Sequence, residues 1–264
     1  MRAAWTTAAL VLTGASVGAG SAAGQDLARR VTSVDDGWVT FQVEVREGVE
    51  VCDQGLRVRR ADGEGWSHRQ GDRDGADRCA PGPMQLEVEV EGGRVTEVRP
   101  GRVRALEGAR TLGTVDPVEA SQYLVALAYT DASVRAAEQG FFLAGLPRGS
   151  DPAPGILRAA RDADLPSRVR RSALFWAGQL AADEATATLG AVAREEGADQ
   201  EVRDAAVFAL SQHRGVDAVP ILMELALEAP HPGTRRSAFF WLSQHDDPAV
   251  ADFLADVILG RKGG

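Results

Sequence analysis

The chain has 264 residues, of which 44% are hydrophobic and 25% are charged. This length and composition allow one or two domains with hydrophobic cores, and they exclude a disordered chain and a membrane-embedded one. The formal net charge is −9. Nucleic acid is therefore not an expected partner, because binding to phosphates calls for a surplus of positive charge.

Residues 1–24 predict a secretory signal peptide. Arg2 gives a short basic start, an apolar core runs from Ala3 to about Ala19, and small residues suit cleavage before Gly24 or Gln25. An uncleaved anchor helix is the alternative, but the core is shorter and less apolar than the roughly 20 residues that a membrane span needs. We therefore expect a periplasmic or secreted protein with no membrane span after cleavage.

Residues 30–113 predict a small β domain. Apolar and polar residues alternate from residue 38 to 45 and again from residue 86 to 90, as in half-buried strands. Gly92 and Gly93 then predict a tight hairpin, because glycine readily adopts the positive φ values that such turns need. Residues 59–83 show no periodicity and predict a long exposed loop.

Cys52 and Cys79 are the two cysteines of the chain, and they bound a polar segment. In an oxidising compartment this arrangement predicts one disulfide, which would stabilise the fold by about 3 to 4 kcal/mol. A redox pair and half of a metal site are the alternatives. Both of these favour closer spacing or nearby histidines.

From Asp116 onward the apolar period becomes helical, and residues 116–262 predict an α-helical region. Asp116 is a candidate N-cap, Pro117 suits the first helical position, and Glu119 lies where a capping box places an acid.

An internal repeat dominates this region. "RRSALFWAGQ" begins at Arg170, "RDAAVFALSQ" at Arg203 and "RRSAFFWLSQ" at Arg235, at spacings of 33 and 32 residues. Such a period predicts helix pairs that bury their apolar faces by stacking on one another. We expect a mainly α fold, in which a small disulfide-bonded β domain precedes an α-solenoid of about four helix pairs. The register predicts that Phe175, Phe208 and Phe240 are core residues, and that Trp176 and Trp241 either fill gaps between repeats or anchor a partner.

The repeats resemble the short HEAT repeats of bacterial proteins, including the subgroup named for phycobilisome lyases. In that family a Val-Arg pair opens one helix of each unit, and the corresponding pairs here are Val134-Arg135, Val169-Arg170, Val202-Arg203 and, with the valine replaced, Thr234-Arg235. The resemblance covers residues 131–260 and implies that the Val-Arg helices line a concave surface. The lyase activity does not carry over, because no chromophore-binding residue can be matched.

Five polar residues are candidates for contact with a partner on that surface: Arg171, Arg236, Gln179, Gln212 and Gln244. The three glutamines occupy one repeat position. Their alternative role is to bond the turn backbone at each helix end, as half-buried amides commonly do.

The expected function is that of an exported, non-enzymatic scaffold or adaptor that binds another protein, with no cofactor. One alternative is a regulatory binder of an envelope protease or sensor. A second alternative is a metal-dependent enzyme built on His213 and His245, which share a repeat position and lie near Asp246. The chain has no recognisable nucleophile motif or phosphate-binding loop.

Overall fold

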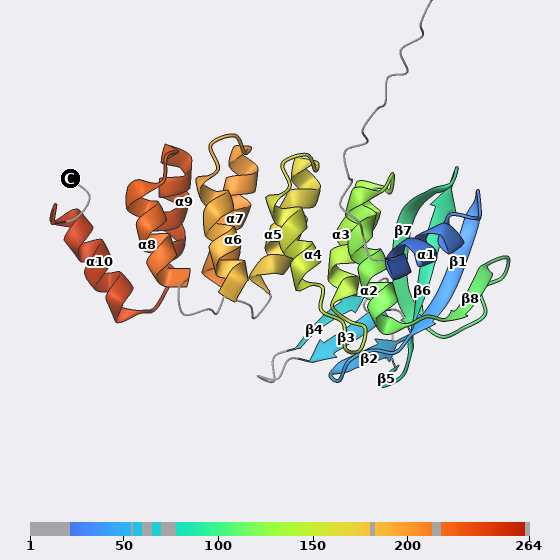
Figure 1. Cartoon of the computed structure of the whole chain (residues 1–264). Coiled ribbons are helices and arrows are strands. Elements are labelled where there is room, and N and C mark those ends of the chain that lie inside the picture. Colours follow the sequence, from blue (N-terminus) through green and yellow to red (C-terminus); the bar gives the residue numbers. More distant parts are fainter. Residues whose placement is uncertain are drawn as a thin grey trace, which may run out of the picture.

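A computed structural model describes residues 22–53, 55–59, 65–69, 78–179, 183–212 and 218–261. It places a β region at one end of an elongated row of stacked helices, and the chain runs along that row to its C-terminus (Figure 1). After a first helix, the elements follow the predicted order, with the strands before the helices of the solenoid.

The larger sheet contains β1 (Gly37–Val43), β6 (Met84–Glu91), β7 (Arg94–Arg102) and β8 (Arg110–Thr114), in the order β7-β6-β1-β8. Its neighbouring strands are antiparallel except for β1 and β8. Gly92 and Gly93 have φ values of 56° and 74° between β6 and β7, which confirms the predicted hairpin. One face of the sheet is apolar and buried, as the alternation predicted.

The smaller sheet contains β2 (Val49–Cys52), β3 (Gly55–Arg59), β4 (Gly65–Arg69) and β5 (Cys79–Ala80), in the order β4-β3-β2-β5. Cys52 and Cys79 lie opposite each other in the ladder and form the predicted disulfide. The predicted loop over 59–83 is wrong in part, because β4 and β5 fall inside it. These strands are too short for a periodic pattern, and they form by pairing with β3 and β2.

A helix that the sequence did not indicate, α1 (Ala22–Val31), packs on the first helix of the solenoid. Its Leu27 and Val31 are fully buried. In the same core Phe41 of β1 meets the ring of Tyr123 at a centroid distance of 6.2 Å. The core therefore continues from the larger sheet into the helices without a break.

The helices form two layers (Figure 1). One layer contains α3 (Val134–Ala144), α5 (Ser167–Gly178), α7 (Gln200–Gln212) and α9 (Pro232–Leu242). The other contains α2 (Pro117–Ala126), α4 (Ala153–Arg161), α6 (Asp183–Arg194), α8 (Ala218–Glu228) and α10 (Pro248–Ile258), with a short 3-10 turn at Leu127–Tyr129.

This arrangement confirms the predicted solenoid of four helix pairs, with α10 following them. Asp116 caps α2 as predicted, because its side chain accepts hydrogen bonds from the backbone N–H groups of Val118 and Glu119. The domain boundaries at residues 113 and 116 stay a prediction, although the last strand of the larger sheet does end at Thr114.

The position of α5 explains why "RRSALFWAGQ" is apolar nearly all round. This helix lies between α3 and α7 and packs on α4. Ala173, Leu174 and Ala177 are buried by these neighbours. One edge of the helix is left for solvent, and Phe175 lies on it with 41% of its surface exposed.

Candidate functional site

The arginines of the Val-Arg pairs bind the end of the helix that precedes them. Arg170 of α5 donates to the Ala160 carbonyl in the last turn of α4. Arg203 of α7 donates to the Ala198 carbonyl beyond α6, and Arg235 of α9 donates to the Ala229 carbonyl beyond α8 at 2.6 Å. Helix ends leave carbonyls without partners, and a cation near them is stabilised by the helix dipole. These three arginines therefore hold three of the helix pairs together: α4 with α5, α6 with α7, and α8 with α9.

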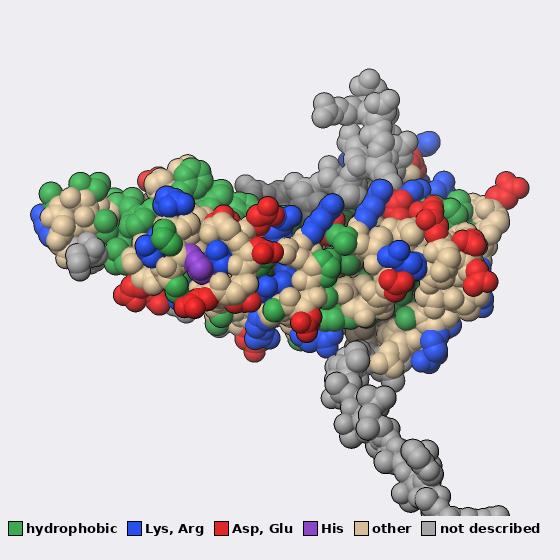
Figure 2. Space-filling view, turned by 90° about the horizontal axis from the view of Figure 1, so that it is seen from above, with side chains coloured by type: hydrophobic (Ala, Val, Ile, Leu, Met, Phe, Trp, Pro, Cys, Tyr) green, Lys and Arg blue, Asp and Glu red, His purple; other side chains and the backbone are tan. Residues whose placement is uncertain are grey.

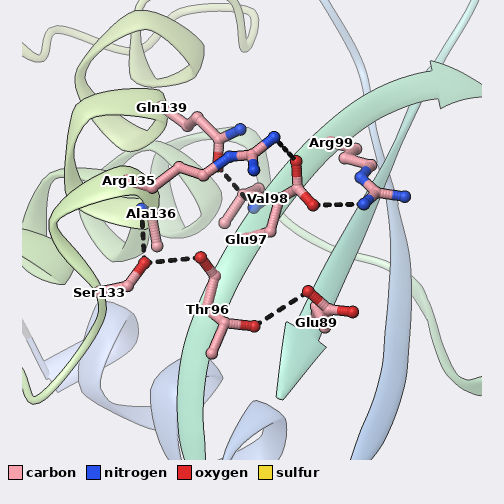
Figure 3. Close-up of polar contacts among 9 residues, drawn as sticks. All are labelled: Glu89, Thr96, Glu97, Val98, Arg99, Ser133, Arg135, Ala136 and Gln139. Atoms are coloured by element: carbon pink, nitrogen blue, oxygen red, sulfur yellow. Dashed lines mark hydrogen bonds and ion pairs between the residues drawn. The ribbon is translucent and has the colours of Figure 1, made fainter. Parts of the chain in front are cut away.

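Arg135, the arginine of the first Val-Arg pair, has a different partner. Its guanidinium binds the carboxylate of Glu97 on β7, and Arg99 binds the second oxygen of the same carboxylate (Figure 3). The side chain of Glu97 is only 5% exposed. In this repeat, therefore, the arginine joins the solenoid to the sheet.

Neighbouring polar groups complete this contact between β7 and α3 (Figure 3). Gln139 of α3 accepts a hydrogen bond from the Val98 backbone N–H at 2.9 Å. Ser133, the N-cap of α3, donates to the Thr96 carbonyl at 2.6 Å and accepts from the Ala136 N–H. We call this cluster, Glu97, Arg99, Ser133, Arg135 and Gln139, the polar seam.

The pKa of Glu97 is lowered from its ordinary value. The hydrogen bond from Arg99 is the largest cause, and the charges of Arg99 and Arg135 act in the same direction, whereas burial opposes them. The carboxylate of the polar seam therefore stays ionised to a lower pH than an exposed glutamate. Each of these groups has a partner on β7 or α3, so the polar seam is a structural contact.

Aromatic rings meet at two of the junctions between successive repeats. Trp176 of α5 stacks on Phe142 of α3 at a centroid distance of 5.2 Å, and Trp241 of α9 meets Phe208 of α7 at 4.9 Å. Both tryptophans thus fill gaps between repeats. We call the surface formed by Phe175, Trp176, Phe208, Phe240 and Trp241 the aromatic face.

The prediction that all three aligned phenylalanines are core residues is wrong. Phe208 is half-buried, but Phe175 is 41% exposed and Phe240 is 57% exposed. Trp241 of the next repeat covers Phe208. In the repeat after Phe175 the equivalent position holds the small residue Ala209, and Phe240 belongs to the last helix of its layer. The residue after each aligned phenylalanine, which is Trp, Ala and Trp in turn, is the sequence signal for this difference.

A groove of about 610 Å³ lies between α7 and α9 beside Phe240. Gln200 and Asp204 of α7 line one side, and Arg236 of α9 lines the other. Gln200 donates to Asp204 at 2.8 Å. Arg236 is exposed, and no described residue forms an ion pair with it, so the groove has a free cation next to an exposed ring.

The structure separates the five predicted contact residues into two rows. Arg171 and Arg236 lie near the starts of α5 and α9, and Arg171 forms an ion pair with Glu201 of α7. The glutamines lie at the other ends of the helices, about 12 Å away for a separation of eight helical residues. They do not form a single strip with the arginines.

The glutamines differ in exposure. Gln179 is half-buried at the C-cap of α5, whereas Gln212 and Gln244 are exposed. The amides of these two donate to the neighbouring hydroxyls of Ser211, at 3.3 Å, and Ser243, at 3.1 Å.

The metal-site alternative depends on two histidines. His213 lies outside the described residues, and His245 is half-buried just beyond α9. Within the described ranges, histidine, cysteine, aspartate and glutamate side chains form no group of three that could hold a metal ion.

Apolar side chains gather over the C-terminal end of the solenoid (Figure 2). Ile258 and Leu259, at the end of α10, are 85% and 61% exposed. Across the part of the chain that the structure covers, none of the helices combines the length and apolar character that crossing a membrane would take.

Comparison with known families agrees with the geometry. The family of HEAT repeats matches the chain over residues 153–242 and again over 193–262. No curated protein matches the chain. The two matches span α4 to α10, and they include α5, α7 and α9, which carry the repeated arginines. The C-terminal half of this chain is a HEAT-repeat α-solenoid.

Proposed function

We propose that the protein is an exported, non-enzymatic scaffold or adaptor that binds another protein through its aromatic face. The observation that carries this proposal is the exposure of Phe175 and Phe240 at one repeat position in two different repeats. Large aromatic side chains are favoured at binding hot spots, and burying them against a partner removes apolar surface from water.

The family supports a protein partner, because HEAT repeats generally mediate protein–protein interaction. The groove beside Phe240 adds a polar component. Arg236 can donate to a carboxylate or carbonyl of a partner while the ring of Phe240 contacts an apolar side chain. A partner that binds here gains both contacts within one helical turn, since residues four apart lie on one face of a helix.

The absence of catalytic activity is part of the proposal. Buried charged residues are the usual candidates for catalysis. Arg170 and Arg203 of the solenoid are buried, and both bond to helix ends. Glu97 is buried, and it bonds within the polar seam. These groups already have structural roles.

Export is supported by two features. A disulfide such as Cys52–Cys79 persists in oxidising compartments. Cleavage before Gly24 or Gln25 would remove only the first residues of α1, and the mature chain would keep the buried anchors Leu27 and Val31.

A paired capture experiment tests the binding proposal. The wild-type protein and a Phe175→Ser, Phe240→Ser variant are immobilised and exposed to envelope extract, and bound proteins are identified by mass spectrometry. We expect the wild type to capture a partner protein, and we expect the amount captured by the variant to be at least about tenfold lower, equivalent to 1.4 kcal/mol. Melting temperature is measured in parallel to show that both proteins are folded.

Val118→Ser provides the matched control. Val118 is also 41% exposed, but it lies on α2 in the other layer. This variant should capture the partner as the wild type does. Equal capture by the double variant and the wild type would overturn the proposal, and so would equal loss in the Val118→Ser control.

Cell fractionation tests export separately. We expect the protein in the periplasmic or secreted fraction, with a mature N-terminus at Gly24 or Gln25 and with Cys52 bonded to Cys79. A full-length cytoplasmic protein with two free thiols would contradict this part of the proposal without affecting the aromatic face.

A further inference from the structure

A second cavity, of about 390 Å³, lies in the opposite layer from the aromatic face. It opens between α2 and α4, and its lining includes Val125, Ala126, Tyr129, Pro152, Pro154 and Arg158. This volume falls in the range of sites that bind small molecules or the end of a peptide. Its apolar wall and few polar groups also fit that class of site.

Gly155 allows the two helices that form the cavity to lie close together. A Cβ atom at this position would stand 2.6 Å from Cγ1 of Val125, which is closer than two non-bonded carbon atoms can approach. The apolar wall is therefore a fixed part of the helix packing.

The guanidinium of Arg158 lies over the ring of Tyr129, 4.0 Å from its centroid. A guanidinium that contacts a ring in this way can still direct N–H groups toward a planar anion. No carboxylate among the described residues forms an ion pair with Arg158. Asp151, which also lines the cavity, accepts a hydrogen bond at 3.0 Å from the N–H of Ala153, the first residue of α4.

The hydroxyl of Tyr129 is buried, and none of the described residues meets the geometry of a hydrogen bond with it. Burial raises the pKa of this phenol, and the negative charge of Asp162 acts in the same direction, whereas Arg158 opposes them. Tyr129 therefore remains a neutral donor at physiological pH. A buried donor without a partner costs free energy, and a ligand that accepts its hydrogen bond removes that cost.

We propose that this cavity binds a carboxylate that is carried on an apolar group. The carboxylate accepts hydrogen bonds from the edge of Arg158 and from the Tyr129 hydroxyl, and the apolar group packs against Val125 and the two prolines. Two sources supply this chemistry: the C-terminus of a peptide with an apolar last residue, and a free small carboxylic acid. The inference does not depend on the aromatic face.

Isothermal titration calorimetry on the full chain tests it with three probes: acetyl-Gly-Gly-Leu with a free carboxylate, the same peptide as its C-terminal amide, and hexanoate. We expect the free-carboxylate peptide to bind at least tenfold more tightly than the amide. Hexanoate that binds as tightly as that peptide would identify a small acid as the source, whereas weaker binding of hexanoate would identify a peptide terminus.

Variants locate the site. Arg158→Leu should weaken binding of the acid probes at least tenfold, and Tyr129→Phe, which keeps the ring, should weaken it about threefold. Arg161→Leu is the matched control, because Arg161 is an exposed arginine one turn further along α4 and does not line the cavity. Binding that survives Arg158→Leu unchanged, or no binding of either acid at millimolar concentration, would overturn the proposal.

Discussion

The polar seam, which attaches the solenoid to the sheet, and the junction between α7 and α9 use different chemistry. The polar seam between β7 and α3 depends on the ionised carboxylate of Glu97 between Arg99 and Arg135. The junction between α7 and α9 depends on the contact between Phe208 and Trp241. The first contact should respond to pH and salt, and the second should respond mainly to the shape and area of the side chains.

The largest expected effect is at the aromatic junction. Trp241→Ala should lower the free energy of unfolding by about 3 kcal/mol, at the low end for truncating a large aromatic residue because Trp241 is half-buried. Since no charge changes, the loss should be the same at neutral and acidic pH. Urea unfolding at two pH values measures it. Trp241→Phe should recover more than half of the loss, and a full loss in that variant would show that the ring contact is not the cause.

The contribution of the polar seam to stability should depend on pH, unlike that of the aromatic junction. Glu97→Gln should cost about 2 kcal/mol at neutral pH, the scale of hydrogen bonds to a charged group. The folded pKa of Glu97 is lowered, so its contribution is present above the ordinary glutamate pKa and is lost as the pH falls through the folded value. Wild type and variant should therefore converge in acid.

A control for this comparison is Glu195→Gln. Glu195 pairs with Arg170 in the solenoid, and its side chain is 31% exposed, against 5% for Glu97. The loss of stability at neutral pH should be smaller than that of Glu97→Gln, because water screens a more exposed ion pair. An equal loss in the two variants would contradict the distinct role of the buried carboxylate in the polar seam.

A smaller effect is expected at the junction of α5 and α7, where the helices touch through small residues. A Cβ atom at Gly178 would lie 2.8 Å from the Ala209 carbonyl oxygen. Gly178→Ala should cost about 1 kcal/mol, because overpacking costs more than the gain in helix propensity returns. Ser211→Ala, at the same position of the next repeat, should change stability less, and calorimetric melting of both variants makes the comparison.

The smallest effect on stability is expected for the combined Gln179→Ala, Gln212→Ala and Gln244→Ala variant. Two of these glutamines are exposed and bond only to neighbouring hydroxyls among the contacts described above. The loss should stay below about 1 kcal/mol, as for most surface substitutions. If they contact the partner, capture falls at least about tenfold in the same variant. A destabilised protein that still captures its partner would assign the glutamines to the turn backbone instead.

The repeats were predictable because the same short sequence pattern, with the same packing, recurs in each unit. The spacing of Arg170, Arg203 and Arg235 follows from one packing arrangement that recurs, and the cap at Asp116 follows from chemistry within four residues. The disulfide was predictable because Cys52 had a single possible partner within the chain.

Other features depend on contacts between distant residues. No local pattern shows that Arg135 binds Glu97 from a strand 38 residues earlier. Likewise, α1 is short, and its burial comes from the helix on which it packs. The exposure of Phe175 depends on Ala209 in the following repeat, so the alignment alone placed this phenylalanine incorrectly in the core.

The arginine bonds to helix ends have a consequence for how the array can change in length. Arg203 and Arg235 each bind a carbonyl just beyond the helix before their own, so a duplicated or deleted unit keeps these bonds intact. After gain or loss of a middle unit by recombination, each remaining arginine would therefore still have a carbonyl to bind. The unit that contains Arg135 cannot be duplicated or deleted in this way, because its arginine binds Glu97 of the sheet. Copy number can thus vary toward the C-terminus while the first unit stays fixed.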